Sequence, residues 1–428
     1  MTYALRVELS SKIIQSIRHS IEKKKSVFSE KKYLDSLFLP SNIIGRNQEA
    51  AKLIMHIESL KQGLVVPAIS VYGRSGSGKS TVVRLVCENL QDIISSSFVN
   101  LRKSKTVFGC VNSILSELGS DQVKSADGMN KAIEKIGNKI KEILTSDKKQ
   151  FYVLVLDEYD VIFSDTRGKP SDFMYKLLTL EENLREKGLW LSIITISNNA
   201  LADYNLDDRV KSRIGNSEVF FSPYGREDVF AILNDRAEKA FLTKPDKKAL
   251  QYCSQICSDN WGDARRALDL LRLAGEISNG IWISKEDIDK ANEQLQTDRV
   301  SNIIKNASFH QRLLLGSICC CTISLNNGWV STSSIYDRYQ FIRSSNSKPL
   351  SYRRAEDLLK EIENSGLANS RTISRGRYGF GREYRLVMHP NQIGPLIDKE
   401  WWERSKCDFR ALYTTFENRG RFVSSGRY

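Results

Sequence analysis

The octapeptide from Gly73 to Ser80 constrains this chain more than any other stretch, because it fits the pattern G-x-x-x-x-G-K-[ST] in full. Residues 68–72 before it predict a short buried strand, and residues 81–90 after it carry apolar side chains at helical spacing. A glycine loop between a strand and a helix lets successive backbone N–H groups point at phosphate oxygens. The sequence therefore predicts a phosphate-binding loop.

The positions of this loop have different expected roles. We expect Lys79 to reach the β- and γ-phosphates of a nucleotide, and the Ser80 hydroxyl to bind Mg²⁺. The remaining residues expected to contact the nucleotide are Gly73, Arg74, Ser75, Gly76, Ser77, Gly78 and Thr81. The expected cofactors are therefore ATP or ADP together with Mg²⁺.

A pair of acids completes the expected nucleotide site. Residues 151–156 form a continuous apolar run, typical of a strand buried on both faces of a parallel sheet, and Asp157 and Glu158 follow it. Because ligands bind at the carboxyl ends of parallel strands, these acids are expected to face the phosphate loop. We expect Asp157 to bind Mg²⁺ and Glu158 to orient and polarise the attacking water.

Further polar groups follow later in the chain. Asn198 comes directly after another apolar strand and is expected to hydrogen-bond the γ-phosphate or the attacking water. Arg209 and Arg213 lie in one short run, and either suits an arginine finger that acts on a neighbouring subunit. Arg265 stands near the start of a helix, where a lid could bring it over the γ-phosphate.

The order of strands and helices predicts three folded domains. Strands alternate with helices in the first, which predicts a doubly wound α/β domain with a parallel sheet. Helices alone follow, and after a polar joint at 297–307 come three more helices and two strands. The expected parts are a basic arm at 1–39, the nucleotide-binding domain at 40–222, a helical lid domain at 223–300, a winged-helix domain at 301–395 and a basic tail at 396–428.

Positive charge is concentrated near the C-terminus. From Tyr336 onward there are 18 Lys and Arg against 11 Asp and Glu, a surplus of 7 in a chain whose net charge is +13. Such an excess suggests a polyanionic partner. Five arginines and two aromatic residues lie on or near one predicted hairpin: Arg371, Arg375, Arg377, Arg382, Arg385, Tyr378 and Phe380.

We expect this hairpin to be the wing of a DNA-binding winged helix, entering or flanking the minor groove. Helix 352–364, which begins with Tyr352-Arg353-Arg354, is then the recognition helix in the major groove. A winged helix used for protein contact is the alternative. Thr332 and Ser333 are expected to cap the helix that starts there.

Taken in order, these elements resemble a known family. The P-loop, Asp157-Glu158, Asn198, Arg209 or Arg213, and the lid run Gly262-Asp263-Ala264-Arg265 are similar to those of AAA+ ATPases. The lid run, the run from Arg209 to Arg213 and the trailing winged-helix pattern resemble the origin-recognition initiator family in its compact archaeal form. The resemblance spans about residues 35 to 390. It implies an α/β P-loop AAA+ domain, a helical lid and a C-terminal winged-helix domain.

The resemblance also implies a function. It implies an ATP-controlled protein that binds double-stranded origin DNA, together with copies of itself or paralogous initiator subunits, and helps recruit or load the replicative MCM helicase. In the family the finger arginine acts on a neighbouring subunit, so a lone monomer is expected to be a weak ATPase. That role falls to Arg213 first and to Arg209 second.

Bulk composition fits an intracellular location. Mean hydropathy is −0.36, no apolar run approaches the roughly 20 residues that span a bilayer, and the N-terminus has no apolar signal core. We expect a cytoplasmic, nucleoid-associated protein with no membrane partner. The eight cysteines show no paired C-x-x-C spacing, which favours small core residues in a reducing compartment over a metal site.

Two other functions fit the same elements. One is a regulatory P-loop ATPase in which the winged helix is only a hinge. The other is a DNA-binding relative that acts in transcriptional control or in plasmid or viral maintenance. Weak DNA affinity would favour the first, and specific binding at sites other than origins would favour the second.

Overall fold

The computed structural model describes residues 26–64, 66, 68–104, 106–165, 168–204, 206–214, 217–260, 262–278, 282–324, 328–342, 348–374 and 380–405. The chain divides into two compact units, Met1–Ala291 and Asn292–Tyr428. Among the described residues, no helix has both the length and the apolar character that crossing a bilayer requires.

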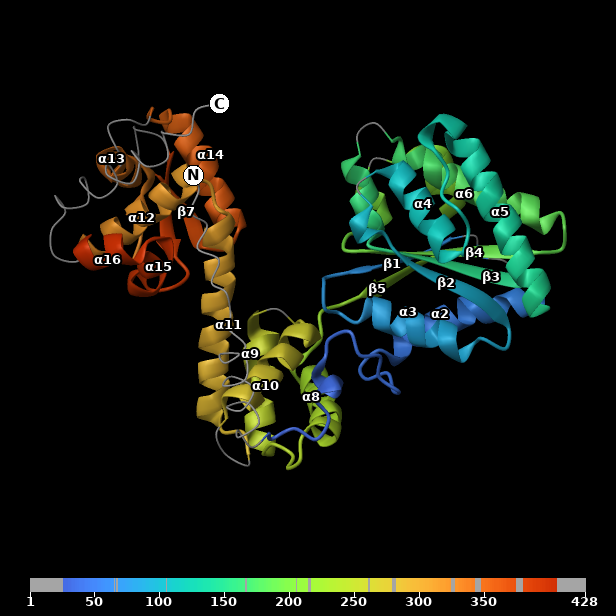
Figure 1. Cartoon of the computed structure of the whole chain (residues 1–428), viewed down its shortest axis with the longest axis horizontal. Coiled ribbons are helices and arrows are strands. Elements are labelled where there is room, and N and C mark those ends of the chain that lie inside the picture. The colour runs from blue at the N-terminus through green and yellow to red at the C-terminus, as the bar shows by residue number, and fades with distance from the viewer. Residues whose placement is uncertain are drawn as a thin grey trace, which may run out of the picture. The chain divides into compact units, whose positions relative to one another are not determined.

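The first unit is built on a five-stranded parallel sheet (Figure 1). The strands are β1 (Ala68–Gly73), β2 (Ile94–Asn100), β3 (Phe151–Asp157), β4 (Trp190–Ser197) and β5 (Glu218–Phe221). Their order is β2-β3-β4-β1-β5, so β1 is enclosed by β4 and β5. This sheet confirms the predicted doubly wound α/β fold.

Helices cover both faces of this sheet. One face carries α2 (Asn47–Glu58) and α3 (Lys79–Asn89), and the other carries α4 (Val107–Glu117), α5 (Gly128–Asp147) and α6 (Pro170–Arg185) (Figure 1). In β3, Val153 and Val155 join the first apolar layer, whereas Leu154 and Leu156 join the second. Burial on both faces explains the continuous apolar run in the sequence.

Strand β2 begins at Ile94 and includes Ser95 and Ser96, whose hydroxyls weaken the apolar pattern of a strand. The Ser95 hydroxyl donates to the Asp147 carboxylate at 2.6 Å, which satisfies it inside the fold. A local polar contact thus extends the strand beyond its apolar part.

Helix α7 (Asp208–Ile214) lies between β4 and β5 in the chain. A set of helices follows β5, namely α8 (Arg226–Ala240), α9 (Lys247–Asn260), α10 (Ala264–Ile277) and α11 (Lys285–Asn306). Helix α11 continues to Asn306 through the polar joint predicted at 297–307. The expected interruption of helical structure at this joint is therefore wrong. Val300 and Ile304, one helical turn apart, are both buried in the apolar core of the second unit, which explains why the helix continues there.

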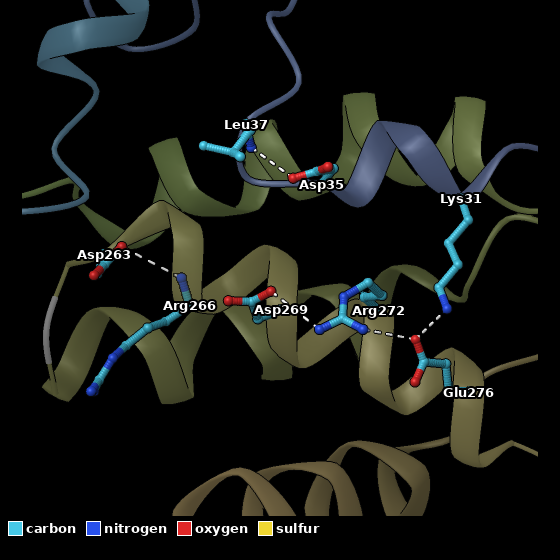
Figure 2. Close-up of polar contacts among 8 residues, drawn as sticks. All are labelled: Lys31, Asp35, Leu37, Asp263, Arg266, Asp269, Arg272 and Glu276. Carbon is cyan, nitrogen blue, oxygen red and sulfur yellow. Dashed lines mark hydrogen bonds and ion pairs between the residues drawn. The ribbon is translucent and has the colours of Figure 1, made fainter. Parts of the chain in front are cut away.

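Residues 26–44, here called the strap, lie partly on the lid helices. Phe28 stacks on Phe241 with ring centroids 4.9 Å apart, and the Ser29 N–H donates to the Ala240 carbonyl at 2.8 Å. Figure 2 shows Lys31 and Arg272 converging on the Glu276 carboxylate. The described part of the predicted basic arm is therefore seated on the lid, while residues 1–25 lie outside the described residues.

The second unit contains the predicted helices and hairpin. Helices α12 (Phe309–Ser324), α13 (Thr332–Ile342) and α14 (Tyr352–Asn364) pack with a three-stranded antiparallel sheet of order β6-β8-β7. Its strands are β6 (Val330–Ser331), β7 (Ala368–Ser374) and β8 (Phe380–Leu386). Strand β8 already pairs with β7 at its start, where Gly381 and Arg382 pair with Ile373 and Thr372. Cys319, Cys320 and Cys321 are buried, as expected of small core residues.

The start of α13 differs from its predicted caps. The Ser331 hydroxyl accepts the N–H of Ser334 at 3.2 Å, so Ser331 occupies the capping position rather than Thr332 or Ser333. The Thr332 hydroxyl is buried and donates to the Arg382 carbonyl at 2.9 Å. Thr332 therefore ties the helix to strand β8.

Two short helices close the second unit, α15 (Pro390–Ile397) and α16 (Lys399–Ser405). Trp401 and Trp402 of α16 are almost completely buried in the apolar core of this unit. The Trp401 ring lies so close to Gly316 of α12 that a Cβ there would be 3.0 Å from it. The first part of the predicted tail at 396–428 is thus packed structure, and residues 406–428 lie outside the described residues.

Trp401→Ala should lower the free energy of unfolding of the second unit by about 3–5 kcal/mol, because it empties a large core site. Chemical denaturation of the full chain, followed by fluorescence and circular dichroism, measures the change. Trp282→Ala is the matched control, since Trp282 is 71% exposed and should change stability by less than about 0.5 kcal/mol. Equal effects of the two substitutions would contradict the packing described here.

Candidate functional site

The loop between β1 and α3 has the backbone geometry of a phosphate cradle. Gly76 and Gly78 have φ angles of 75° and 92°, in the left-handed region that favours glycine. A Cβ at Gly78 would lie 2.3 Å from the Tyr224 hydroxyl, so the loop is also closely packed from outside. The predicted loop residues Ser75, Gly76, Gly78, Lys79, Ser80 and Thr81 line one cleft.

Lys79 is buried at the first position of α3. Its ammonium group donates to the carbonyls of Gly73 and Arg74 at 2.6 and 2.9 Å, which keeps it folded back over the loop. Burial lowers the pKa of Lys79, and the charge of Asp157 opposes that shift. The predicted residues Gly73 and Arg74 thus contribute backbone carbonyls that hold this amine.

Asp157 lies beside the loop, as predicted. Its carboxylate accepts a hydrogen bond from the Ser80 hydroxyl at 3.1 Å and from the Asn100 amide at 3.4 Å. Burial raises the pKa of Asp157, while the bonds from Ser80 and from the Glu158 N–H act in the opposite direction. A hydroxyl and a carboxylate oxygen at one point are hard ligands of the kind that suits Mg²⁺. Asn100, which the sequence did not single out, supports this pair from the end of β2.

Glu158 adopts an unusual backbone conformation. Its φ of 56° puts a non-glycine residue in the left-handed region directly after β3. Such strain costs on the order of 1–3 kcal/mol and tends to occur at functional sites. The residue lines the same cleft as Lys79 and Ser80, so the turn directs the chain after β3 along the predicted site.

Asn198 also lines the cleft, at the end of β4. Its amide donates to the Asp160 carboxylate at 3.0 Å, and its backbone N–H lies 3.4 Å from the same oxygen. Asp160 therefore fixes the orientation of the Asn198 amide. The structure brings Asn198 together with Asp157 and Glu158, because β3 and β4 are adjacent in the sheet.

The lid reaches the loop through the start of α10. Asp263 caps this helix by accepting the N–H groups of Arg265 and Arg266 at 2.9 and 3.4 Å, and the Ala264 N–H donates to the Gly76 carbonyl at 3.3 Å (Figure 2 shows Asp263 and Arg266). Arg265 lines the same cleft as the loop. The structure thus brings Arg265 to the predicted nucleotide site.

One wall of the cleft is apolar and was not predicted. It combines residues of the strap with residues of the lid: Phe38, Pro40, Ile43, Ile44, Ile232 and Leu268. Arg236 of α8 holds the strap in place, since its guanidinium donates to the Phe38 carbonyl at 3.2 Å. The sequence around Pro40 indicates only an interruption of regular secondary structure. It does not predict an apolar wall, because an isolated apolar pair such as Ile43-Ile44 carries no periodic signal.

Arg209, the second of the two finger candidates, is not among the described residues that line this cleft. Arg209 makes two side-chain bonds to Asp207, at 2.7 and 3.0 Å, and its guanidinium lies 5.0 Å from the Tyr175 ring centroid. The bond to Asp207 raises the pKa of Arg209. Arg213 lies in α7, and its side chain is outside the described residues.

The predicted DNA-contacting arginines surround α14 and the hairpin of the second unit. Arg353 and Arg354 stand in the first turn of α14, which the Ser351 hydroxyl caps. Arg371 on β7 and Arg382 on β8 lie on the hairpin, whereas Arg375, Arg377 and Tyr378 lie outside the described residues. The structure thus brings the described members of this set to one helix and one hairpin of the same small unit.

Three of these arginines already have acidic neighbours. Arg371 donates twice to Glu383, at 2.7 and 2.9 Å, and lies 4.5 Å from the Trp329 ring centroid. Arg354 is 3.9 Å from Glu361, and Arg382 is 3.6 Å from Glu363. Phe380, which is 81% exposed, lines a hollow with Tyr352, Lys360 and Arg382 between α14 and the hairpin.

Three family models match successive parts of the chain. They describe an AAA domain at residues 67–199, a Cdc6 AAA+ ATPase-type lid domain at 230–293 and a CDC6 C-terminal winged helix domain at 302–394. ORC1-type DNA replication protein 1 of Aeropyrum pernix is 30% identical over 365 residues, which cover 82% of this chain and 89% of that protein. The chain belongs to the ORC1-type DNA replication protein family.

Other comparisons agree with this family. ORC1-type DNA replication protein 1 of Sulfurisphaera tokodaii is 29% identical over 399 residues, covering 91% of this chain and 97% of that protein. The structure of the Aeropyrum pernix ORC1 protein in complex with DNA matches with a TM-score of 0.69 and 27% identity, covering 88% of this chain and 98% of that one. The predicted family and its AAA+, lid and winged-helix architecture are thus confirmed.

Gly76→Ala should loosen the start of α10 in this ORC1-type protein. A Cβ at residue 76 would lie 1.8 Å from the Asp263 carboxylate, so the cap must move, at a cost of about 0.5–2 kcal/mol to the first helical turn. The backbone N–H groups of Arg265 and Arg266 donate hydrogen bonds to Asp263, so their faster hydrogen exchange measures the loss of the cap.

Gly63→Ala is the matched control. Gly63 has nearly the same φ, 74°, but a Cβ there would meet no atom within 4 Å, so it adds similar backbone strain without a clash. Equal exchange at α10 in both variants would show that Asp263 does not depend on Gly76.

Proposed function

We propose that this ORC1-type protein is an ATP-dependent initiator of DNA replication. It binds double-stranded origin DNA through its winged helix and AAA+ domain, together with copies of itself or paralogous initiators, and helps recruit or load the replicative MCM helicase. Slow ATP hydrolysis serves as the switch. The observation that carries this proposal is the convergence of the P-loop, Asp157, Glu158 and the lid residue Arg265 on one cleft, in a chain that also has a winged helix.

In the proposed complex, the loop N–H groups bind phosphate oxygens and Lys79 turns from the loop carbonyls toward the β- and γ-phosphates. Ser80 and Asp157 hold Mg²⁺, which neutralises charge on the phosphate oxygens. The apolar wall formed by the strap and the lid receives the base. A purine that contacts both parts links the nucleotide to the position of the lid.

For hydrolysis, we propose that Glu158 orients a water molecule in line with the γ-phosphorus. The water oxygen forms the new bond to phosphorus as the bond to the β–γ bridging oxygen breaks, and the bridging oxygen leaves with ADP. Asn198, held by Asp160, hydrogen-bonds the water or the γ-phosphate. Arg265 adds positive charge at the same phosphate from the lid.

A neighbouring subunit completes this site. In the described part of a single chain, Arg209 bonds to Asp207 and lies away from the cleft, which supports a finger that acts between subunits. Since the Arg209 guanidinium is already engaged, Arg213 is the first candidate. The dependence on a neighbour makes hydrolysis slow in an isolated chain and couples it to assembly on DNA.

On DNA, α14 is proposed to enter the major groove and the hairpin to flank the minor groove. Arg353 and Arg354 stand at the end of α14 that would meet the bases. The other arginines of the set, together with Tyr378, are assigned to backbone contacts at the wing. We propose that the protein acts in the cytoplasm, on the nucleoid, since both proposed ligands, the nucleotide and the DNA, occur there.

Two inactive variants should restore hydrolysis when mixed. Lys79→Ala removes a ligand of the phosphates but keeps the finger, whereas Arg213→Ala keeps the site but offers no finger. We expect each alone to lose activity, by about 1,000-fold for Arg213→Ala, and the mixture to recover part of it. Phosphate release is measured in the presence of DNA at a protein concentration that permits assembly.

Arg209→Ala separates the two finger candidates in the same assay. It should retain most of the hydrolysis, because its guanidinium is bonded to Asp207. If Arg209→Ala instead loses activity and complements Lys79→Ala, Arg209 is the finger. If Arg213→Ala loses activity but its mixture with Lys79→Ala stays inactive, Arg213 does not act on a neighbouring subunit. If both Arg213→Ala and Arg209→Ala stay active, hydrolysis does not need a finger from this helix.

Arg353→Ala together with Arg354→Ala should weaken DNA binding about tenfold or more and lower the slope of log affinity against log salt by about 1–2. Capture of genomic DNA fragments by the full chain, followed by sequencing at two salt concentrations, identifies the bound sites. Lys305→Ala, which removes an exposed cation from α11, is the control and should leave the bound sites unchanged.

Sharp peaks at replication start sites, lost in the double variant, support the initiator. Sharp peaks elsewhere would support transcriptional control or plasmid or viral maintenance instead. Diffuse binding that does not depend on Arg353 and Arg354 would favour a regulatory ATPase.

A further inference from the structure

Arg46 is a buried charge that the nucleotide site described above does not use. It precedes α2 and is only 3% exposed, and it does not line the cleft formed by the described residues. The preceding Gly45 has a φ of 67° and packs so closely on α8 that a Cβ would meet the Asp228 carboxylate at 2.5 Å. The backbone at residues 45 and 46 is therefore fixed between the lid and the sheet domain.

The guanidinium of Arg46 connects three parts of the first unit. Its Nε donates to the Ser77 carbonyl of the P-loop at 3.0 Å, and a terminal nitrogen donates to the Ser222 carbonyl, just after β5. The other terminal nitrogen pairs with Glu49 at 3.1 Å. The Tyr224 ring lies against the guanidinium, 4.0 Å from its carbon to the ring centroid. Each of the three nitrogens thus has a partner, and the Tyr224 ring covers one face of the group.

The bond to Ser77 determines how one loop peptide is turned. The Ser77 carbonyl and the Gly78 N–H belong to the same planar trans peptide, so they point in opposite directions. With the carbonyl held by Arg46, outside the cleft, the Gly78 N–H points to the inner side of the loop. Backbone N–H groups that face inward are what a phosphate-binding loop needs.

The bond to Ser222 and the stack on Tyr224 join the same group to the hinge of the lid. Ser222 and Tyr224 lie between β5 and α8, and the Tyr224 N–H donates to the Gly262 carbonyl at 3.2 Å, next to the cap of α10. The Tyr224 hydroxyl also abuts Gly78, where a Cβ would be 2.3 Å away. The lid hinge, through Ser222 and Tyr224, and the loop, through Ser77, are therefore both in contact with the Arg46 side chain.

We propose that Arg46 is a positioning residue for nucleotide binding, which sets the Ser77–Gly78 peptide for a phosphate and fixes the lid hinge to it. This inference rests on the proposed binding of ATP or ADP at the P-loop. If Arg46 only stabilised the fold, the ion pair with the Glu49 carboxylate would be enough to compensate its buried charge. The donor directed at Ser77 ties Arg46 to the loop, and the donor directed at Ser222 ties it to the lid hinge.

Arg46→Lys separates charge from geometry. Lysine keeps the positive charge, but its single ammonium group cannot replace a planar fork that donates to Ser77 and Ser222 while lying on Tyr224. We expect the full chain with Arg46→Lys to bind ADP about 10- to 100-fold more weakly, because buried hydrogen bonds of a charged group are lost. Adenosine, which has no phosphate, should bind as it does to the unmodified chain.

Affinities are measured by displacement of a fluorescent ADP analogue, and thermal unfolding without nucleotide shows whether each variant is folded. Arg226→Lys is the matched control, since Arg226 is an exposed arginine of α8 that bonds to Gln255, and it should leave both affinities unchanged. Glu49→Gln is a second variant that loosens Arg46 without changing its side chain. It should weaken ADP binding several-fold and spare adenosine, so the test survives if Arg46→Lys does not fold.

Unchanged ADP binding in both Arg46→Lys and Glu49→Gln would overturn the proposal. So would an equal loss of ADP and adenosine affinity, because that pattern indicates a general change of the cleft rather than a misplaced phosphate donor. Failure of the unmodified chain to bind ADP at all would contradict the proposed nucleotide site itself, and it is distinguishable because it needs no variant.

Discussion

The candidate nucleotide site depends on the burial of β1 between β4 and β5. Parallel pairing sets a fixed register, in which Tyr72 pairs with Ser197 and Gly73 pairs with Phe221. The carboxyl ends of the strands therefore meet at one edge, and the loop that leaves β1 lies beside the acids that end β3. Residues more than 70 positions apart in the chain, such as Ser80 and Asp157, become hydrogen-bonded neighbours as a consequence. Any change that moved β1 out of this position would separate the loop from Asp157 and Asn198 together.

The lid and the strap add what the sheet edge lacks. The sheet edge supplies charged and polar groups, whereas the strap and the lid helices supply the apolar wall of the cleft. The lid is held to the loop by few polar contacts, among them the bond from the Ala264 N–H to the Gly76 carbonyl. The strap in turn is fixed to the lid through Phe28 and Lys31. A ligand that fills the cleft thus contacts three segments whose mutual position it can stabilise, which is the physical basis of the proposed control by a nucleotide.

Much of this fold could be predicted from local signals, and the exceptions have a common cause. The P-loop and the run at 151–156 are continuous patterns, so the sheet and its acidic edge follow from the sequence. The course of α11 and the packing of Trp401 could not be predicted in this way, because both depend on apolar contacts with elements distant in the chain. Asn100 and Arg46 carry no pattern of their own. Their positions become meaningful only once the sheet register and the lid hinge are known.

Electrostatics of the winged helix illustrate how a structure changes the meaning of a count. The sequence shows a surplus of basic residues, yet Arg354, Arg371 and Arg382 each have a carboxylate of Glu361, Glu383 or Glu363 nearby. Ion pairs at a protein surface contribute at most about 1 kcal/mol, so a phosphate can displace such a carboxylate at little cost. Until then the pairs hold the arginines in defined positions and lower the local positive potential. In the proposed DNA complex, nonspecific attraction is thereby reduced more than contact with a site whose shape fits the helix and the hairpin, which favours selective over indiscriminate binding.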